Sequence, residues 1–367
     1  MTVSILRPYV ANRSRSLSFR VIRAGLVGFG ILIVILLLLI LHVVTQQPRS
    51  GRVMRLVTQI SLPPAASFVA ATDYAAVLDH SLFVSYSSAD TLLTIDTATN
   101  TVSTFATHLE GIHGVAFAAD STHLFASLGS ANRVAVVKLA DASSRQFVPT
   151  GLEPDGIVFD RKADVVYVGN GKSNSATMIP AEDLDHPFAI KLGGSPEFPQ
   201  VDETTGLIYQ PLEDTSEVVV LSPMERKVVS RFPVSPCEGP KGTAIDQEHR
   251  LLFIGCSNRL LAVMNLQDGH IIATSPIGRF VDYVAFDPGL RRVYTANSAG
   301  TMTIIEQIGE GRYMVLENIR TKAGGHTLAI DPRTHRVYVI CAGIIRGASV
   351  VVFEPANLGA SVTDPHR

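Results

Sequence analysis

The sequence predicts an all-β fold, a seven-bladed β-propeller, with an N-terminal transmembrane helix. The first observation is a repeat: aromatic residues recur at intervals of 42, 42, 42, 44, 41 and 44 residues, at Phe83, Phe125, Tyr167, Tyr209, Phe253, Tyr294 and Tyr338. A period near 42 residues is typical of a propeller blade, a four-stranded sheet that buries its faces by stacking on its neighbours. Seven aromatic residues therefore indicate seven blades.

The second observation is the hairpin pattern around each aromatic residue. In the third repeat, an apolar run ending at Asp160 precedes a four-residue polar turn and a second apolar run over 165–170. Two further short runs complete a four-stranded sheet. Aspartates recur in these turns at Asp160, Asp202, Asp246, Asp287 and Asp331. We interpret them as structural, because an aspartate accepts backbone N–H hydrogen bonds in a turn.

The ends of the repeat array complement one another. The last repeat lacks a fourth strand after 349–353, while 53–62 is strand-like and belongs to no complete blade. An N-terminal strand that completes the last blade would close the ring and remove its exposed edges. The propeller is thus predicted over 53–357, followed by a polar tail over 358–367.

The third observation is an apolar run over 24–44 that contains no charged side chain unless His42 is protonated. Its 21 residues, at about 1.5 Å each, span about 30 Å, the thickness of a bilayer core. A basic segment, 1–23, carries five arginines and no acid, and a linker, 45–52, follows the run. This predicts a single-pass anchor in the cell membrane with a cytoplasmic N-terminus and an extracytoplasmic propeller, periplasmic in a Gram-negative cell. A cleaved signal peptide is the alternative reading.

Charge and cysteine content limit the function. The chain has 31 Lys plus Arg and 33 Asp plus Glu; without the eight arginines of residues 1–55, 23 basic and 33 acidic residues remain. This acidic balance does not favour nucleic acid as a partner. Three cysteines are too few for a disulfide framework. A single disulfide between Cys237 and Cys256 is one interpretation, and small buried strand residues are the other.

A ring of ionisable residues emerges from the register. Twelve residues before each aromatic residue, where the innermost strand begins, the second to seventh repeats carry His113, Asp155, Glu197, Lys241, Asp282 and His326. The first repeat has Ala71 at that offset and Asp73 two residues later. Because innermost strands line the central channel, these seven side chains are expected to surround one mouth of it and bind a protein partner or a small ligand. Alternatively, the mouth is polar only because it is wet.

The repeats resemble those of the YncE-like (YVTN) β-propellers. The resemblance is carried by strings such as Arg292-Val-Tyr-Thr-Ala-Asn297 and Val165-Val-Tyr-Val-Gly-Asn170, each after an aspartate-containing turn. It implies a propeller whose relatives include extracytoplasmic binding proteins, lactonases and the large subunits of amine dehydrogenases. No catalytic motif of those enzymes is present.

Two functions remain open. The first is a binding or scaffolding module that acts through the channel mouth. The second is a lactonase-like hydrolase that uses ring histidines and carboxylates as acid and base. Asp73, His113 and His326 come from adjacent blades of a closed ring and form one candidate set for a divalent metal. A carrier of a redox cofactor ranks third, because no motif for its covalent attachment is present, and the sequence does not indicate an oligomeric state.

Overall fold

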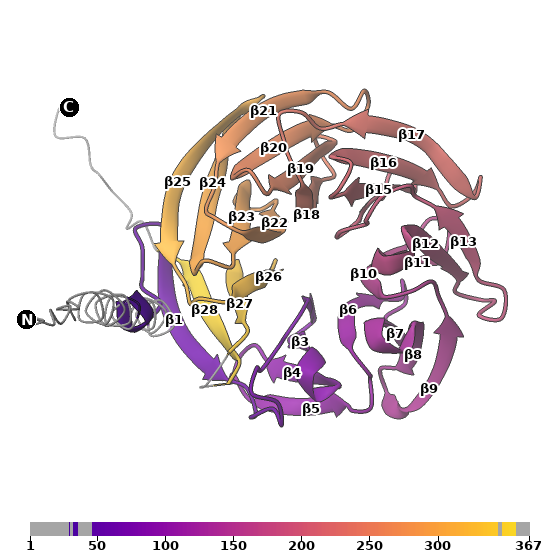
Figure 1. Cartoon of the computed structure of the whole chain (residues 1–367), viewed down its shortest axis with the longest axis horizontal. Coiled ribbons are helices and arrows are strands. Elements are labelled where there is room, and N and C mark those ends of the chain that lie inside the picture. Colours follow the sequence, from indigo (N-terminus) through magenta and orange to yellow (C-terminus); the bar gives the residue numbers. More distant parts are fainter. Residues whose placement is uncertain (1–28, 30–31, 36–45, 344–346, 357–367) are drawn as a thin grey trace, which may run out of the picture. The chain divides into compact units, whose positions relative to one another are not determined.

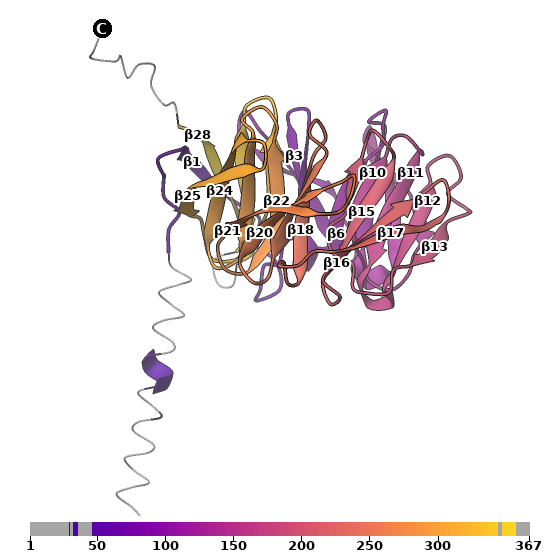
Figure 2. The same ribbon diagram turned by 90° about the horizontal axis from the view of Figure 1, so that it is seen from above.

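The computed structural model describes residues 29, 32–35, 46–343 and 347–356, and residues 47–356 belong to one compact unit. Within it, 28 strands form seven four-stranded antiparallel sheets around a central axis, which confirms the predicted seven-bladed propeller (Figure 1). Viewed from the side, the connecting loops lie on two opposite faces of the ring (Figure 2). We call the face on which the innermost strands begin the mouth face, and the opposite one the turn face.

Within each blade the strands follow chain order from the centre outward. The first three blades are β2 (Ala75–Leu78), β3 (Ser81–Tyr86), β4 (Thr91–Asp96) and β5 (Val102–Ala106); β6 (Ile112–Phe117), β7 (His123–Leu128), β8 (Arg133–Lys138) and β9 (Asp141–Pro149); and β10 (Pro154–Asp160), β11 (Val165–Asn170), β12 (Ser175–Pro180) and β13 (Phe188–Lys191). Short 3-10 helices follow the second strand of each, at η1 (Ser87–Ala89), η2 (Gly129–Ala131) and η3 (Gly171–Ser173).

The remaining blades repeat this order. They are β14 (Gln200–Asp202), β15 (Leu207–Leu212), β16 (Glu217–Ser222) and β17 (Lys227–Pro233); β18 (Pro240–Asp246), β19 (Leu251–Cys256), β20 (Leu260–Asn265) and β21 (Ile271–Pro276); β22 (Val281–Asp287), β23 (Arg292–Asn297), β24 (Thr301–Gly309) and β25 (Arg312–Arg320); and β26 (Gly325–Asp331), β27 (Arg336–Cys341), β28 (Ser349–Pro355) and β1 (Met54–Ser61).

The ring closes through β1, as the sequence predicts. β1 pairs antiparallel with β28 from Met54 opposite Pro355 to Ser61 opposite Ser349, and so supplies the outer strand of the seventh blade. Residues 48–53 lie along β25 of the sixth blade, where the Arg49 N–H donates to the Arg320 carbonyl (3.1 Å) and the Arg52 N–H donates to Glu317 (2.8 Å). Ordered contacts therefore begin inside the segment expected to be a linker, 45–52.

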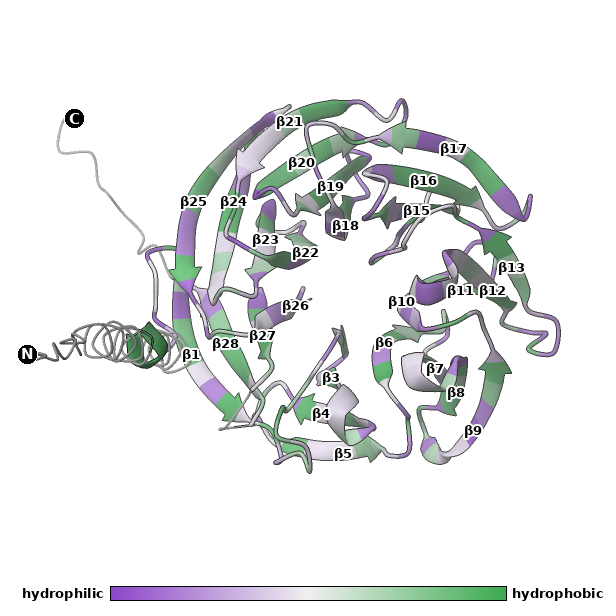
Figure 3. Cartoon of the chain, in the orientation of Figure 1, coloured by the Kyte–Doolittle hydropathy of each residue, from purple (hydrophilic) through white to green (hydrophobic). Residues whose placement is uncertain are grey.

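The core lies between the blades. Buried apolar side chains of the described residues form seven clusters, each shared by two neighbouring blades. Each cluster contains one of the seven repeat aromatics, none of which is more than 4% exposed. The middle strands are accordingly hydrophobic along most of their length, while hydrophilic stretches of β10, β18 and β26 face the centre (Figure 3). The repeat aromatics are therefore packing residues between blades.

The recurring aspartates stabilise the turns of the turn face. Each is at most 2% exposed, and each accepts a backbone N–H from its own turn, as when the Lys162 N–H donates to Asp160 (2.9 Å) and the Arg333 N–H to Asp331 (3.0 Å). Their structural interpretation is confirmed by these hydrogen bonds.

The predicted transmembrane segment, 24–44, falls mostly outside the described residues, as do 1–23 and 358–367. Its described residues, Phe29 and 32–35, are helical with exposed side chains. Among the described residues, no helix is both long and apolar enough to cross a bilayer.

Candidate functional site: the channel mouth

All seven predicted ring residues lie where innermost strands begin at the mouth face. His113, Asp155, Lys241, Asp282 and His326 lie within β6, β10, β18, β22 and β26, whereas Asp73 lies two residues before β2 and Glu197 three residues before β14. All seven are half-buried. The structure brings them into two ionic groups and leaves two members outside these groups.

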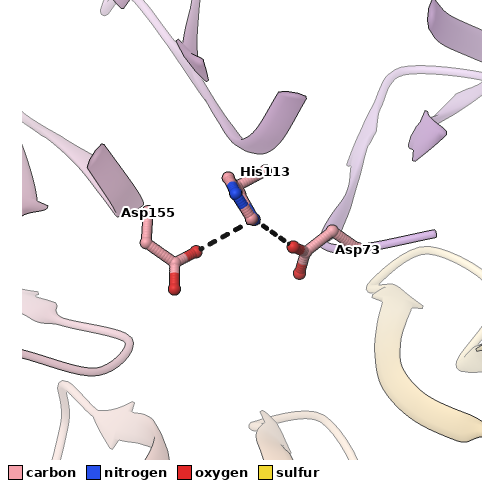
Figure 4. Close-up of side chains that lie close together, drawn as sticks. All are labelled: Asp73, His113 and Asp155. Atoms are coloured by element: carbon pink, nitrogen blue, oxygen red, sulfur yellow. Dashed lines mark hydrogen bonds and ion pairs between the residues drawn. The ribbon is translucent and has the colours of Figure 1, made fainter. Parts of the chain in front are cut away.

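The first group joins blades one to three. The His113 Nδ1 donates a hydrogen bond to Asp73 and lies 3.7 Å from Asp155 Oδ1 (Figure 4). Burial lowers the pKa of His113, but the two carboxylates outweigh it and raise that pKa to about 9. Burial and the nearby Asp73 raise the pKa of Asp155 to about 7. Two carboxylates therefore hold His113 as an imidazolium near neutral pH.

A glycine makes room for this imidazole. A Cβ at Gly129, in η2, would lie 2.4 Å from His113 Nε2, closer than side-chain carbons approach one another. The same histidine lines a pocket of about 250 Å³ with Ser130, Glu153 and Lys172. The position of His113 thus depends on the neighbouring loop of its own blade.

The second group joins blades four and five. Lys241 Nζ lies 2.9 Å from Glu197 Oε1 and 2.6 Å from Glu213 Oε2. Burial raises the pKa of Glu197 to about 8. Burial opposes the effect of Lys241 at Glu213, but hydrogen bonding from the ammonium group lowers the pKa of that carboxyl. One ammonium group therefore balances two neighbouring carboxyl groups.

His326 and Asp282 stand outside both groups. The two ring nitrogens of His326 lie 2.9 Å from the Gly324 carbonyl and 3.0 Å from the Thr72 carbonyl. Carbonyl oxygens only accept hydrogen bonds, so this orientation turns both nitrogens toward the backbone. Among the described residues, the Asp282 carboxylate has no hydrogen-bond or ion-pair partner, and its burial raises its pKa.

Three aromatic rings meet one residue after members of the ring. Tyr74, Phe198 and Tyr283 directly follow three of the ring residues, and their ring centroids lie 4.7, 5.0 and 5.7 Å apart. They belong to blades one, four and six, which are not neighbours, so their rings meet near the axis and form the floor of the mouth. Burial, together with Asp155 and Asp73, raises the pKa of Tyr74 well above its usual value.

These aromatic rings and Glu213 were not predicted as site residues. The rings follow Asp73, Glu197 and Asp282 by one position, and Glu213 lies four residues after the repeat aromatic Tyr209, where η2 and η3 begin with Gly129 and Gly171. The register that identifies the ring would therefore have identified both sets.

One part of the mouth has the geometry of a metal-ligand set. Ligand atoms of Asp73, His113 and Asp155 all lie within 4.8 Å of one another, and Asp155 Oδ1 is buried with no hydrogen-bond partner. Imidazole and carboxylate groups are common ligands of divalent metals. This group shares Asp73 and His113 with the predicted metal set but contains Asp155 in place of His326.

The loop that leads to Lys241 is tied to its own blade. Cys237 and Cys256 form a disulfide, with 5.4 Å between their Cα atoms. Cys256 lies opposite Pro240, next to Lys241 in β18. The disulfide therefore anchors the chain where it enters the mouth.

No protein-family model and no curated protein matches the sequence. Solved structures with the same architecture include Kuenenia stuttgartiensis hydrazine synthase, with a TM-score of 0.68, 13% identity and coverage of 77% of this chain and 95% of that one. The streptogramin B lyase structure has a TM-score of 0.65 and 8% identity, with coverage of 83% of this chain and 98% of that one. The RRP9 WD40 repeats have a TM-score of 0.64 and 14% identity, with coverage of 85% of this chain and 99% of that one. At such identities the likeness shows the β-propeller fold alone, and the YncE-like resemblance stays a prediction.

Proposed function

We propose that this protein is a binding module that recognises a ligand or protein partner at the mouth face of its propeller. The observation that supports this most is the convergence of ionisable side chains from all seven blades at the mouth face, beside three aromatic rings that meet near the axis. Such polar groups in a concavity are typical of recognition sites. A YncE-like extracytoplasmic binding protein would have this role.

The pairing of the charges favours binding over acid–base catalysis. The Nδ1 of His113 is engaged by Asp73, both nitrogens of His326 face carbonyl oxygens, and Lys241 is held by two carboxyl groups. A general base needs a free lone pair within reach of its substrate. His113, with a pKa of about 9, is an imidazolium near neutral pH and has no lone pair to offer, and both nitrogens of His326 point at carbonyl oxygens.

Photo-crosslinking from the two faces tests this proposal. A photoreactive phenylalanine analogue replaces Phe280, which lies on a mouth-face loop and is 63% exposed, or Met224, which lies on a turn-face loop and is 82% exposed. Crosslinking in intact cells is expected from position 280 and not from 224, and it should diminish when Asp282 is replaced by Asn. Crosslinks that form equally from both faces, or only from position 224, would contradict the proposal.

We further propose that residues 24–44 anchor the propeller in the cell membrane with the N-terminus cytoplasmic. Its support is the uncharged run, the five preceding arginines and the Cys237–Cys256 disulfide, a bond that persists in oxidising compartments. A reporter enzyme that is active only outside the cytoplasm, fused after Arg367, should be active. A full-length but inactive fusion would indicate the opposite orientation, with the propeller in the cytoplasm.

A metal-dependent, lactonase-like hydrolase is the second candidate. The spacing of Asp73, His113 and Asp155 specifically favours it. If it is correct, purified protein should retain about one divalent metal per chain and hydrolyse lactones, and His113→Ala should abolish both properties. His249→Ala is the matched control, since His249 contacts Asp246 in a turn-face turn. Metal-free protein without lactonase activity would eliminate this candidate and leave the binding module.

A further inference from the structure

Resting on the proposed binding function, we propose that the partner is a polypeptide segment that inserts one basic side chain, lysine or arginine, into the mouth against Tyr74 and Asp282. The segment would place apolar residues on the rim of the mouth face. Three independent features support this: charge, the aromatic floor and the exposed rim.

The mouth has more acidic than basic groups. The ring residues and Glu213 comprise five acidic side chains, Asp73, Asp155, Glu197, Glu213 and Asp282, and three basic ones, His113, Lys241 and His326. Beside them lie the Glu153–Lys172 ion pair and Arg279. Burial raises the pKa of Asp155 to about 7 and that of Glu197 to about 8, so these two groups carry only part of their negative charge near neutral pH. The uncompensated carboxylate is that of Asp282, which has no hydrogen-bond or ion-pair partner in the described part of the chain. An incoming cation would supply the missing partner of this carboxylate.

The aromatic floor suits a cation with an alkyl stem. Tyr74 directly follows Asp73, and its ring contacts those of Phe198 and Tyr283, which directly follow Glu197 and Asp282, so the floor lies beside these carboxyl groups. Phe198 and Tyr283 present further aromatic surface beside Tyr74. Aromatic faces attract ammonium and guanidinium groups, and they pack against methylene groups. A basic side chain satisfies both properties of this floor.

The rim distinguishes a polypeptide from a small amine. Phe68, Leu152 and Phe280 are 75%, 53% and 63% exposed, and each lies in a loop that leads into a ring residue. The Arg279 guanidinium lies over the Phe280 ring, 5.2 Å from its centroid. These side chains lie in mouth-face loops that enter blades one, three and six, and exposed apolar side chains of this size are typical of a protein interaction surface. A small amine would fill the mouth without reaching them.

Binding of peptide pools to the purified full chain in detergent tests this proposal. Four immobilised pools of random hexapeptides carry Lys, Arg, norleucine or Glu at a fixed third position. Norleucine keeps the alkyl stem of lysine and lacks its charge. We expect the Lys and Arg pools to retain at least about tenfold more protein than the other two, since one charge-assisted contact is commonly worth a factor of that size. Equal retention of all four pools, or retention by none, would overturn the proposal.

Variants locate the contact. Asp282→Asn should abolish the preference for Lys over norleucine, whereas Asp268→Asn, in an exposed turn-face turn, should leave it unchanged. Tyr74→Phe should retain most of the binding and Tyr74→Leu should lose it, because only the former keeps an aromatic face. Thermal melting checks that each variant is folded. A preference for Lys that survives both Asp282→Asn and Tyr74→Leu in folded protein would place the cation elsewhere and overturn the proposal.

Competition separates the two sources of the cation. Free n-butylammonium should displace the Lys pool only at concentrations at least about a hundredfold above those of the peptide, because it cannot contact the rim. If it competes equally well, the ligand is a small amine and the docked segment is wrong. If all peptide pools fail while crosslinks from position 280 persist, the partner is not basic and the binding module itself still stands.

Discussion

Replacing Met54 by alanine tests the closure of the ring through a single side chain. Met54 begins β1, is fully buried, and packs in the cluster shared by blades six and seven with Tyr294 and Phe353. Its sulfur lies 4.0 Å from the Tyr294 hydroxyl oxygen. This environment exists only if the N-terminal strand completes the seventh blade.

The expected magnitude follows from the atoms removed. The substitution deletes three buried heavy atoms, worth about 2.4 kcal/mol at about 0.8 kcal/mol per methylene-sized group. The cavity that remains among rigid neighbours adds to this, so the loss should be about 2–5 kcal/mol. That is a large part of the roughly 5–15 kcal/mol by which a domain is stable. Opening of the blade would also expose the edge of β28 and promote aggregation.

Unfolding by guanidinium chloride of the full chain and of its Met54→Ala and Met224→Ala variants measures this effect. Met224→Ala is the matched control, because Met224 is 82% exposed and its truncation should change the free energy of unfolding by less than about 0.5 kcal/mol. If Met54→Ala is as stable as Met224→Ala, β1 does not close the propeller in solution and the reasoning is refuted.

Three further predictions concern the mouth. The pKa of His113 is about 9 in the folded protein and near 6.5 in the unfolded chain, so its contribution to folding stability is complete below pH 6.5 and is lost as pH rises to 9. Asp73→Asn should flatten this decline in the free energy of unfolding, measured by denaturant titrations at pH 6, 7.5 and 9. Gly129→Ala should destabilise by about 1–3 kcal/mol, because its Cβ would lie 2.4 Å from His113, whereas Gly171→Ala, with its nearest atom at 3.6 Å, should be neutral in the same titration. Cys237→Ser opens a disulfide that joins residues 19 positions apart and should cost about 3 kcal/mol; a reductant should bring wild type to that level and leave the variant unchanged.

The repeating parts of the fold could be predicted from the sequence. The number of blades and the hairpin around each repeat aromatic followed from the spacing of Phe83 and its six equivalents, because each aromatic residue packs in a cluster between its own blade and the next. The closing strand followed from an unmatched strand at each end. These features depend on periodicity, which a sequence displays directly.

The pairing of side chains within the mouth could not be predicted in the same way. The register places His113 next to Asp73 on one side and Asp155 on the other, and it also allows the set with His326. The outcome depends on rotamers and backbone carbonyls: His326 turns to Gly324 and Thr72, and so does not join Asp73. Neither feature has a signature in residue spacing.

Hydrogen exchange of the full chain with and without a retained Lys hexapeptide tests the central claim, that the mouth face is the binding surface. We expect the peptide to slow exchange in the loops that lead to ring residues, at 150–155, 195–199 and 279–283. Exchange in the turn-face loops at 160–164 and 246–250 should be unchanged. Protection confined to the turn face or to the outer strands β5, β9 and β13 would contradict it.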